Sequence, residues 1–216
     1  MDPNSCTPSG PGAYPSDCEV REGYRKIARE KAMHNNRSEN WQVTLSKAKD
    51  IKLLLLDVDG VLTDGNLIYS HEGKESKSFN TQDGFGLRML QDAGVEVGII
   101  TARSSEALER RASDLKISHL YQGAANKLIA YQEIVKKTGL KPFQIAYMGD
   151  DWLDMVLLKR VGLSLAPANG VLEVKEMVHY TTEQSGGHGA VREACNLILE
   201  GLGKYNELLQ GYLTRC

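Results

Sequence analysis

The chain has 216 residues, of which 41% are hydrophobic and 25% are charged, and its formal net charge at pH 7 is -2. This length and composition are those of a globular protein that buries one core of ordinary size. A near-neutral chain has no basic field to attract nucleic acid, and no apolar run approaches the ~20 residues of a membrane span, so neither partner is expected.

The first 50 residues divide into two parts. Residues 1–35 are expected to be a disordered or weakly helical leader, because residues 1–18 are rich in Pro, Gly and Ser. They show no basic start followed by an apolar core, so no secretory signal is expected. Residues 36–50 are predicted to form an N-terminal helix, since Trp41, Leu45 and Ala48 recur at helical spacing.

Four cysteines are scattered along the chain without a C-x-x-C pair, namely Cys6, Cys18, Cys195 and Cys216. This spacing predicts no zinc site. We expect free thiols, as is typical of a reducing cytoplasm, and a disulfide between the terminal cysteines is the alternative. The cysteine pattern therefore favours a cytoplasmic protein.

From residue 51 onward, short apolar runs alternate with segments of helical periodicity. The apolar runs lie at 51–58, 95–100, 118–123, 143–149 and 162–167. The helical segments lie at 84–93, 104–115, 127–138, 152–161 and 190–200. This alternation indicates βαβ units, and strands that are apolar throughout are covered by helices on both faces. The prediction is a doubly wound α/β domain with a parallel sheet over residues 51–200, followed by a C-terminal tail over 201–216.

Polar side chains stand just beyond the predicted strands, where ligands of doubly wound sheets bind. Asp57 and Asp59 follow the first apolar run, and Thr101 follows the second. Lys127 opens the helix after the third run, and Asp150 follows the fourth. Each residue alone has a structural alternative as a turn residue, a helix cap or a solvated charge. Their joint occurrence at matching strand ends favours an active site.

The stretch DVDGVLTDG does not fit a calcium-binding EF-hand loop. Counted from Asp57, such a loop needs an oxygen ligand at position five, Gly at six and Glu at twelve. Those positions hold Val61, Leu62 and Ile68. The sequence therefore excludes the calcium loop.

The grouped acids suit phosphoryl transfer. Carboxylates without Cys or His ligands favour a hard cation, Mg²⁺ above all. A phosphate monoester repels nucleophiles by its own charge, so a carboxylate attacks it only where a cation and positive donors offset that charge. One acid then serves as nucleophile and a second, two residues on, as general acid and base. A Thr hydroxyl and a Lys ammonium bind the phosphoryl oxygens.

In chain order, DVDGVLTDG, Thr101, Lys127 and GDDWLD resemble the four motifs of the haloacid-dehalogenase-like (HAD) phosphotransferase superfamily. The resemblance implies a Rossmann-like core in which Asp57 is the nucleophile and Asp59 the general acid/base. It also implies that Thr101 and Lys127 complete the catalytic set.

The same resemblance implies a magnesium site. Mg²⁺ would be held by Asp57, the backbone carbonyl of Asp59, and Asp150. Asp151 and Asp154 would support these ligands from behind as a second shell. Mg²⁺ is thus the one expected cofactor.

The spacing of the motifs leaves no room for a separate cap domain. Only 43 residues lie between Asp57 and Thr101, and 22 between Lys127 and Asp150. Residues 65–79 are predicted to form a short β-hairpin instead. An uncapped site is open to bulk water, so we expect an oligomer whose subunits complete one another's sites. The alternative is an open monomer that acts on a large protein substrate.

Longer stretches of sequence resemble one family within this superfamily. FNTQDGFGLRML, TARSSEALERRASDLKISHLYQG, AYMGDDWLD and GGHGAVREACNLIL are similar to the 3-deoxy-D-manno-octulosonate 8-phosphate phosphatase family, over about residues 51–200. The resemblance implies hydrolysis of that sugar phosphate through an aspartyl-phosphate, in lipopolysaccharide precursor synthesis. It also implies a homotetramer, and a C-terminal segment that closes over an active site. The alternatives are a phosphatase for a nine-carbon 2-keto sugar acid 9-phosphate and, more remotely, a non-catalytic oligomerisation module.

The expected substrate carries a phosphate and a carboxylate, so the site needs cations besides Lys127. Arg103, Ala107 and Arg111 fall at i, i+4 and i+8, which predicts that both guanidiniums share one helix face. Arg is suited to bidentate carboxylate binding. The resemblance implies a set of substrate contacts, namely Asp59, Asn80, Thr81, Gln82, Asp83, Gly84, Arg88, Arg103, Arg111 and Lys127.

Overall fold

The computed structural model describes residues 19–26 and 38–214. Most of the expected leader over 1–35 lies outside these residues, apart from an exposed helix at 19–26. Helix α2 (Glu39–Ala48) begins after Ser38, whose side chain accepts a hydrogen bond from the N–H of Trp41. Within the two described ranges, every helix is too short or too polar to span a membrane.

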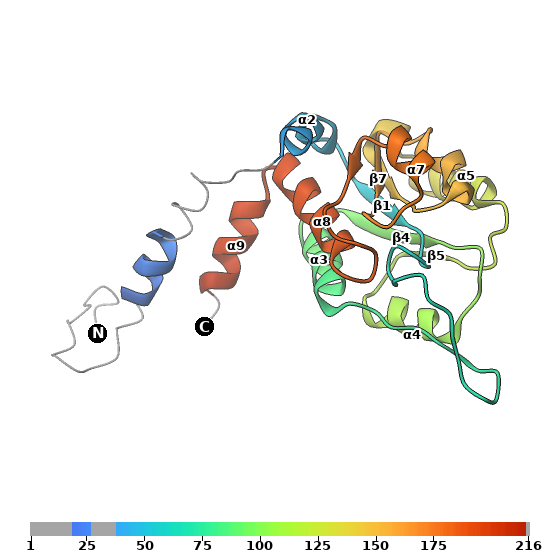
Figure 1. The fold of residues 1–216 in the computed structure, drawn as a ribbon. Coiled ribbons are helices and arrows are strands. Elements are labelled where there is room, and N and C mark those ends of the chain that lie inside the picture. The colour runs from blue at the N-terminus through green and yellow to red at the C-terminus, as the bar shows by residue number, and fades with distance from the viewer. Residues whose placement is uncertain (1–18, 27–37, 215–216) are drawn as a thin grey trace.

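Six parallel strands form the central sheet (Figure 1). In spatial order they are β5 (His119–Tyr121), β4 (Glu96–Ile100), β1 (Leu53–Leu56), β6 (Ile145–Met148), β7 (Leu163–Ala166) and β8 (Tyr180–Thr181). The chain runs outward from β1 through β4 and β5, and then returns to the other side of β1 at β6. This reversal is the topological switch point, where ligands of doubly wound sheets bind. The predicted doubly wound parallel sheet is confirmed.

Strand β1 connects two separate cores because its side chains alternate between the two faces of the sheet. Leu54 and Leu56 enter one hydrophobic cluster, and Leu53 and Leu55 enter the other. All four side chains are fully buried. Burial of a leucine stabilises a fold by roughly 1.5–3 kcal/mol, so this strand is a rigid support for the residues that follow it.

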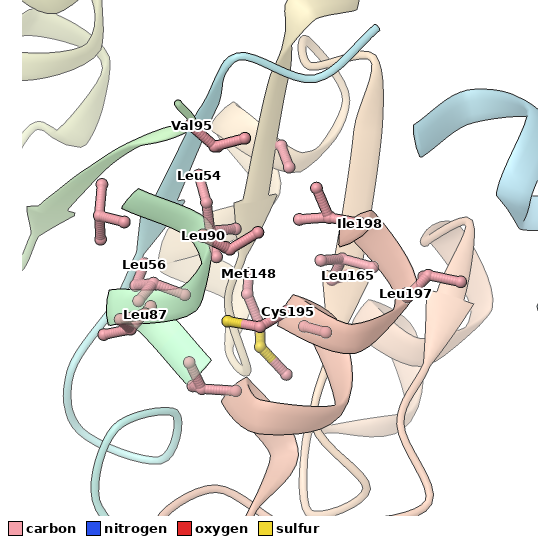
Figure 2. Packing of buried hydrophobic residues seen from close by; sticks show 14 of the residues in the cluster. Leu54, Leu56, Leu87, Leu90, Val95, Met148, Leu165, Cys195, Leu197 and Ile198 are labelled. Carbon is pink, nitrogen blue, oxygen red and sulfur yellow. The ribbon is translucent and has the colours of Figure 1, made fainter. Parts of the chain in front are cut away.

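The first face is covered by α2, α3 (Thr81–Asp92) and α8 (Ala190–Gly201). Figure 2 shows Leu54 of β1 beside Leu90 of α3 and Leu56 beside Leu87, and Cys195 and Ile198 of α8 belong to the same cluster. The second face is covered by α5 (Lys127–Thr138), α6 (Met155–Leu158) and α7 (Leu172–Met177). Helices on both faces explain why the strands are apolar throughout.

The predicted hairpin insertion is confirmed, and no cap domain is present among the described residues. Strands β2 (Ile68–Tyr69) and β3 (Glu75–Ser76) pair antiparallel, with Tyr69 opposite Glu75. Figure 1 shows this segment projecting from the body of the domain.

Several element boundaries differ from the prediction. Helix α3 begins at Thr81 rather than residue 84, because the side chain of Asn80 accepts hydrogen bonds from the first turn. The helix expected over 152–161 is a 3₁₀ turn, η2 (Trp152–Asp154), followed by the single turn of α6. A second 3₁₀ turn, η1 (Pro142–Gln144), leads into β6.

The C-terminal residues form a helix, α9 (Tyr205–Thr214), where the sequence suggested only a tail. Leu208 and Tyr212 pack against the first core. The ring of Tyr212 also meets that of Phe85 edge-on, with 5.3 Å between centroids. These contacts place α9 against α3.

Candidate active site

Three predicted residues meet at the carboxyl ends of the central strands. Asp57 follows β1, and its N–H donates to the carbonyl of Met148 at the end of β6 over 3.0 Å. Thr101 follows β4 directly and is 3% exposed. Asp150 stands two residues beyond β6. The parallel register of β4, β1 and β6 therefore brings these residues together at the switch point, as predicted.

Lys127 is buried among carboxylates at the start of α5. Its ammonium lies 2.9 Å from Asp57 Oδ1 and 2.6 Å from Asp154 Oδ1, and its side chain is 2% exposed. Burial alone would lower the pKa of Lys127, but the attraction of Asp57 and Asp154 outweighs it and raises the pKa. The residue is thus a permanent cation fixed beside Asp57.

Asp154 is fully occupied by hydrogen bonds within the protein. One carboxylate oxygen accepts from Lys127 and from the hydroxyl of Tyr147, and the other accepts from the N–H groups of Asp150 and Asp151. Its side chain is 1% exposed. It therefore orients the loop that carries Asp150, which agrees with a supporting role behind the ligands.

Asp57, Asp150 and Asp154 each offer an oxygen atom, and these atoms lie within 4.8 Å of one another. Burial, followed by repulsion between these acids, raises the pKa of Asp150 to about 7. Burial likewise raises the pKa of Asp57 to about 6, although Lys127 opposes the shift. Closely spaced oxygens without Cys or His ligands fit a hard divalent cation, which would relieve this repulsion. Since Asp154 is already saturated, the side chains left to bind such a cation are those of Asp57 and Asp150.

Two glycines make this close approach possible. A Cβ on Gly60 would lie 2.1 Å from Asp150 Oδ2, and Gly60 also has φ +84°. A Cβ on Gly149 would lie 2.3 Å from Cγ of Asp154. Any side chain at either position would displace a carboxylate, so both glycines are required by the geometry of the site.

Asp59 lies in a more open region, which we call the rim and define as Asp59, Glu75, Lys77 and Arg103. Lys77 hydrogen-bonds Asp59 Oδ1, and Arg103 Nε lies 3.7 Å from Asp59 Oδ2. Glu75 bridges the two cations, at 2.9 Å from Lys77 and 2.5 Å from Arg103. The hairpin thereby reaches the carboxylate expected to be the general acid/base.

Sequence reasoning missed Lys77. Its side chain is 2% exposed although it belongs to an exposed hairpin. The available signal was its spacing from Glu75, because residues two apart in a strand share one face. A Glu and a Lys on one face of a hairpin beside an acidic site indicate an ion-pair network.

The prediction that Arg103 and Arg111 share a helix face is wrong. Helix α4 (Glu106–Asp114) starts after Ser105, whose φ of -153° is extended, so Arg103 lies in the preceding loop. Only Arg111 is helical. Its Nη2 donates to the carbonyl of Asn80 over 3.0 Å, and a Cβ on Gly84 would lie 2.2 Å from the same nitrogen. Gly84 therefore makes room for Arg111.

Two expected substrate contacts have other partners. Arg88 donates to the carbonyl of Asp114, the last residue of α4, over 3.1 Å. Asp83 is 1% exposed, and its carboxylate accepts from the N–H groups of Gly189 and Arg192 at the start of α8. The structure thus assigns Asp83 to the capping of α8 and ties Arg88 to α4.

The remaining predicted residues lie at the N-termini of helices. Thr81 and Gln82 are exposed in the first turn of α3, capped by Asn80. Gln82 also lines a cavity of about 410 Å³ with His188. The Asp151 side chain accepts from the N–H of Trp152 and caps η2, so it contacts its own loop.

Known proteins are similar to this chain in sequence and in fold. Residues 111–193 match the model of the haloacid dehalogenase-like hydrolase family. The 3-deoxy-D-manno-octulosonate 8-phosphate phosphatase of Escherichia coli (strain B / BL21-DE3) is 44% identical over 163 residues, which cover 76% of this chain and 87% of that protein.

Solved structures agree with the sequence match. The Yersinia pestis phosphatase of the same name superposes with a TM-score of 0.75 at 42% identity, covering 79% of this chain and 90% of that one. The Moraxella catarrhalis phosphatase, solved in complex with magnesium ion, phosphate ion and KDO, gives a TM-score of 0.76 at 41% identity and covers 81% and 98% of the two chains.

Proposed function

The chain belongs to the 3-deoxy-D-manno-octulosonate 8-phosphate phosphatase family of haloacid dehalogenase-like hydrolases, and from this membership we propose that it hydrolyses that sugar phosphate to the free eight-carbon acid and inorganic phosphate. The observation that carries the proposal is Lys127, buried between Asp57 and Asp154 at the switch point of the sheet. The product would enter lipopolysaccharide precursor synthesis, in the cytoplasm.

We propose Mg²⁺ as the cofactor, held by Asp57, Asp150 and the backbone carbonyl of Asp59. The oxygen-only donor set and the raised pKa values of Asp57 and Asp150 support this assignment. When bound, the cation would offset the negative charge of the phosphate and so allow a carboxylate to approach it. The remaining steps are carried out by side chains of the chain itself.

In the first step, a carboxylate oxygen of Asp57 attacks phosphorus, and the bond from phosphorus to the sugar oxygen breaks. The electron pair of that bond goes to the sugar oxygen, which takes the carboxyl proton of Asp59. Lys127 stabilises the charge on the phosphoryl oxygens, because it is held 2.9 Å from Asp57 in a dry environment. The Thr101 hydroxyl would donate to the same oxygens.

In the second step, water attacks the phosphorus of the aspartyl-phosphate and gives a proton to the carboxylate of Asp59. The bond between phosphorus and Asp57 breaks, and its electron pair returns to the Asp57 carboxylate. Phosphate leaves, and both acids regain their starting protonation states.

We propose that Arg103 and Arg111 recognise the sugar acid. Arg103 is 42% exposed on the rim, so its guanidinium is accessible to a ligand. Arg111 lies against Asn80 and the Phe79 ring at the start of α3. A planar guanidinium binds a carboxylate through two parallel hydrogen bonds.

We propose a homotetramer in which neighbouring subunits complete the sites. Leu67, Ile68 and Tyr69 of the hairpin are between 46% and 56% exposed. Trp152 and Leu153, beside Asp150, are more than 60% exposed. Adjacent apolar residues of this size favour contact with another protein surface. Light scattering coupled to size exclusion should report four chains, and a monomer at micromolar concentration would contradict the proposal.

The decisive experiment measures phosphate release from a panel of sugar phosphates, with Mg²⁺ and with EDTA. We expect 3-deoxy-D-manno-octulosonate 8-phosphate to give the highest kcat/KM, and EDTA to abolish turnover. A preference for nine-carbon 2-keto acid 9-phosphates would redirect the substrate assignment. No turnover of either class would overturn it.

A further inference from the structure

Lys77 combines an exposed position in the fold with a buried charge. It directly follows β3 of the hairpin, yet its side chain is only 2% exposed. A lysine in an exposed hairpin normally keeps its ammonium in water, because moving an ammonium out of water is costly unless it is paired. The inward orientation of Lys77 therefore requires partners that hold the charge.

Those partners are Asp59 and Glu75. The ammonium hydrogen-bonds Asp59 Oδ1 and lies 2.9 Å from Glu75 Oε1. Two carboxylates therefore offset the charge of one ammonium. Lys77 is thus a charged donor that points at the proposed general acid/base.

Lys77 is better placed than Arg103 to fix the orientation of Asp59. Arg103 Nε lies 3.7 Å from Asp59 Oδ2, which is an ion pair without hydrogen-bond geometry. Arg103 also donates through Nη2 to Glu75 and Tyr69 over 2.5 and 3.1 Å, so this end of its guanidinium is directed at the hairpin and not at Asp59. The hydrogen bond that determines the direction of the Asp59 carboxylate is the one from Lys77.

We propose that Lys77 is a positioning residue for the general acid/base of this enzyme. This inference rests on the proposed function, since it assigns Asp59 to proton transfer. By holding one oxygen of Asp59, Lys77 aims the other at the bond that breaks, so the carboxyl proton reaches the sugar oxygen as that oxygen leaves phosphorus. Glu75 balances the charge of Lys77 and keeps it in place.

The first experiment compares two leaving groups in the Lys77→Met variant. A sugar alkoxide needs a proton to leave, whereas p-nitrophenolate leaves without one. We expect kcat for the sugar phosphate to fall by about 100-fold, the order of loss caused by a misplaced catalytic group. KM should change less than about threefold. Release of p-nitrophenolate in the first turnover should slow by less than about fivefold, because the attack by Asp57 is untouched. The first turnover is measured, and not steady-state kcat, because Asp59 is also the base in the later hydrolysis step.

Lys74→Met is the matched control, since Lys74 belongs to the same hairpin and its side chain is 82% exposed. It should retain the activity of the wild type with both substrates. Lys77→Arg should recover part of the sugar phosphate activity by restoring a donor. Equal losses in the first turnover with both leaving groups would show a structural role for Lys77 and would overturn the proposal, as would a rise in KM at constant kcat.

The second experiment is a double-mutant cycle with Asp59→Asn. If Lys77 acts through Asp59, the double variant should be no slower than Asp59→Asn alone. Losses that multiply would place Lys77 in direct contact with substrate and overturn the proposal. Failure of the substrate assignment is distinguishable, because the cycle can then be repeated with whichever alkyl phosphate the wild type hydrolyses.

Discussion

The two halves of the active site are built differently. The floor, which we define as Asp57, Lys127, Asp150 and Asp154, stands on strand ends and helix starts above a fully buried core. The rim stands on a loop and a hairpin, and is held together by ion pairs.

The difference separates two functions of the site. Asp57 and Asp59 are two residues apart, yet the first belongs to the floor and the second to the rim. Ion pairs in a dry site are weakly screened, whereas those at an exposed surface are weakened by water and salt. The floor therefore suits the nucleophile and the cation, whose positions must be fixed. The rim, where the side chain of Arg103 is 42% exposed, suits groups that meet the substrate as it enters.

The largest expected effect is in the floor. Asp57→Asn removes the attacking carboxylate but keeps its shape, so kcat should fall by at least about 1,000-fold while the fold persists. Steady-state kinetics with circular dichroism checks both expectations. Asp92→Asn, which changes an exposed carboxylate at the end of α3, is the control and should retain most activity. Turnover in Asp57→Asn would rule out the covalent route.

Without a bound metal ion, the repulsion between the buried carboxylates of the floor should make the stability of the protein depend on pH. The folded-state pKa values of Asp57 (about 6) and Asp150 (about 7) lie above the usual 3.8. The folded protein therefore binds more protons than the unfolded chain between about pH 4 and 7, so its free energy of unfolding should fall by a few kcal/mol as pH rises. Urea unfolding in EDTA at several pH values measures this slope.

Asp150→Asn isolates the contribution of one acid to that slope. Burial lowers the pKa of His179, and this group changes stability in the opposite direction as pH rises. His179 is present in both proteins, so the difference between wild type and Asp150→Asn cancels its effect. The variant should show a flatter pH dependence and gain less stability from Mg²⁺ at pH 7.5. Identical slopes would show that the pKa of Asp150 is not raised in the folded protein.

A pair of glycines tests how tightly the floor is packed. Gly60 and Gly73 have similar φ values of +84° and +78°, but only at Gly60 would a Cβ meet Asp150, at 2.1 Å. Each change to Ala should cost about 1 kcal/mol of stability from backbone strain. Gly60→Ala alone should also lower kcat by about 100-fold, because it displaces Asp150. Equal activity in the two variants would mean that Asp150 can shift without loss.

All four floor residues were named from the sequence, whereas of the rim only Asp59 and Arg103 were named. Asp57, Thr101 and Asp150 each follow an apolar run, and the parallel sheet brings such strand ends together. That inference needs only local patterns and one topological rule. Lys77 had only the weaker signal of its spacing from Glu75, because β3 has two residues and the partner Asp59 lies 18 residues earlier in the chain.

Other misses have the same cause, since they depend on partners distant in the chain. The position of Asp83 beside Asn80 suggested a substrate contact, but its carboxylate accepts a hydrogen bond from the N–H of Arg192 in α8, 109 residues later. The spacing of Arg103 from Arg111 suggested that both lie in one helix. The backbone at Ser105 is extended, however, so α4 begins only at Glu106, after Arg103. Capping and ion pairing across distant segments are determined by packing, which periodicity does not encode.

The smallest effect separates two arginines that the sequence treats alike. Arg103 is on the rim, whereas Arg88 donates to the carbonyl of Asp114 at the end of α4. Arg103→Ala should raise KM for the sugar phosphate about tenfold, because one charged hydrogen-bonding group is lost from the substrate site. Arg88→Ala should change KM less than about twofold and cost about 1 kcal/mol of stability at most. A larger KM effect at Arg88 would mean that its side chain leaves α4 to bind substrate, and that the rim extends along α3.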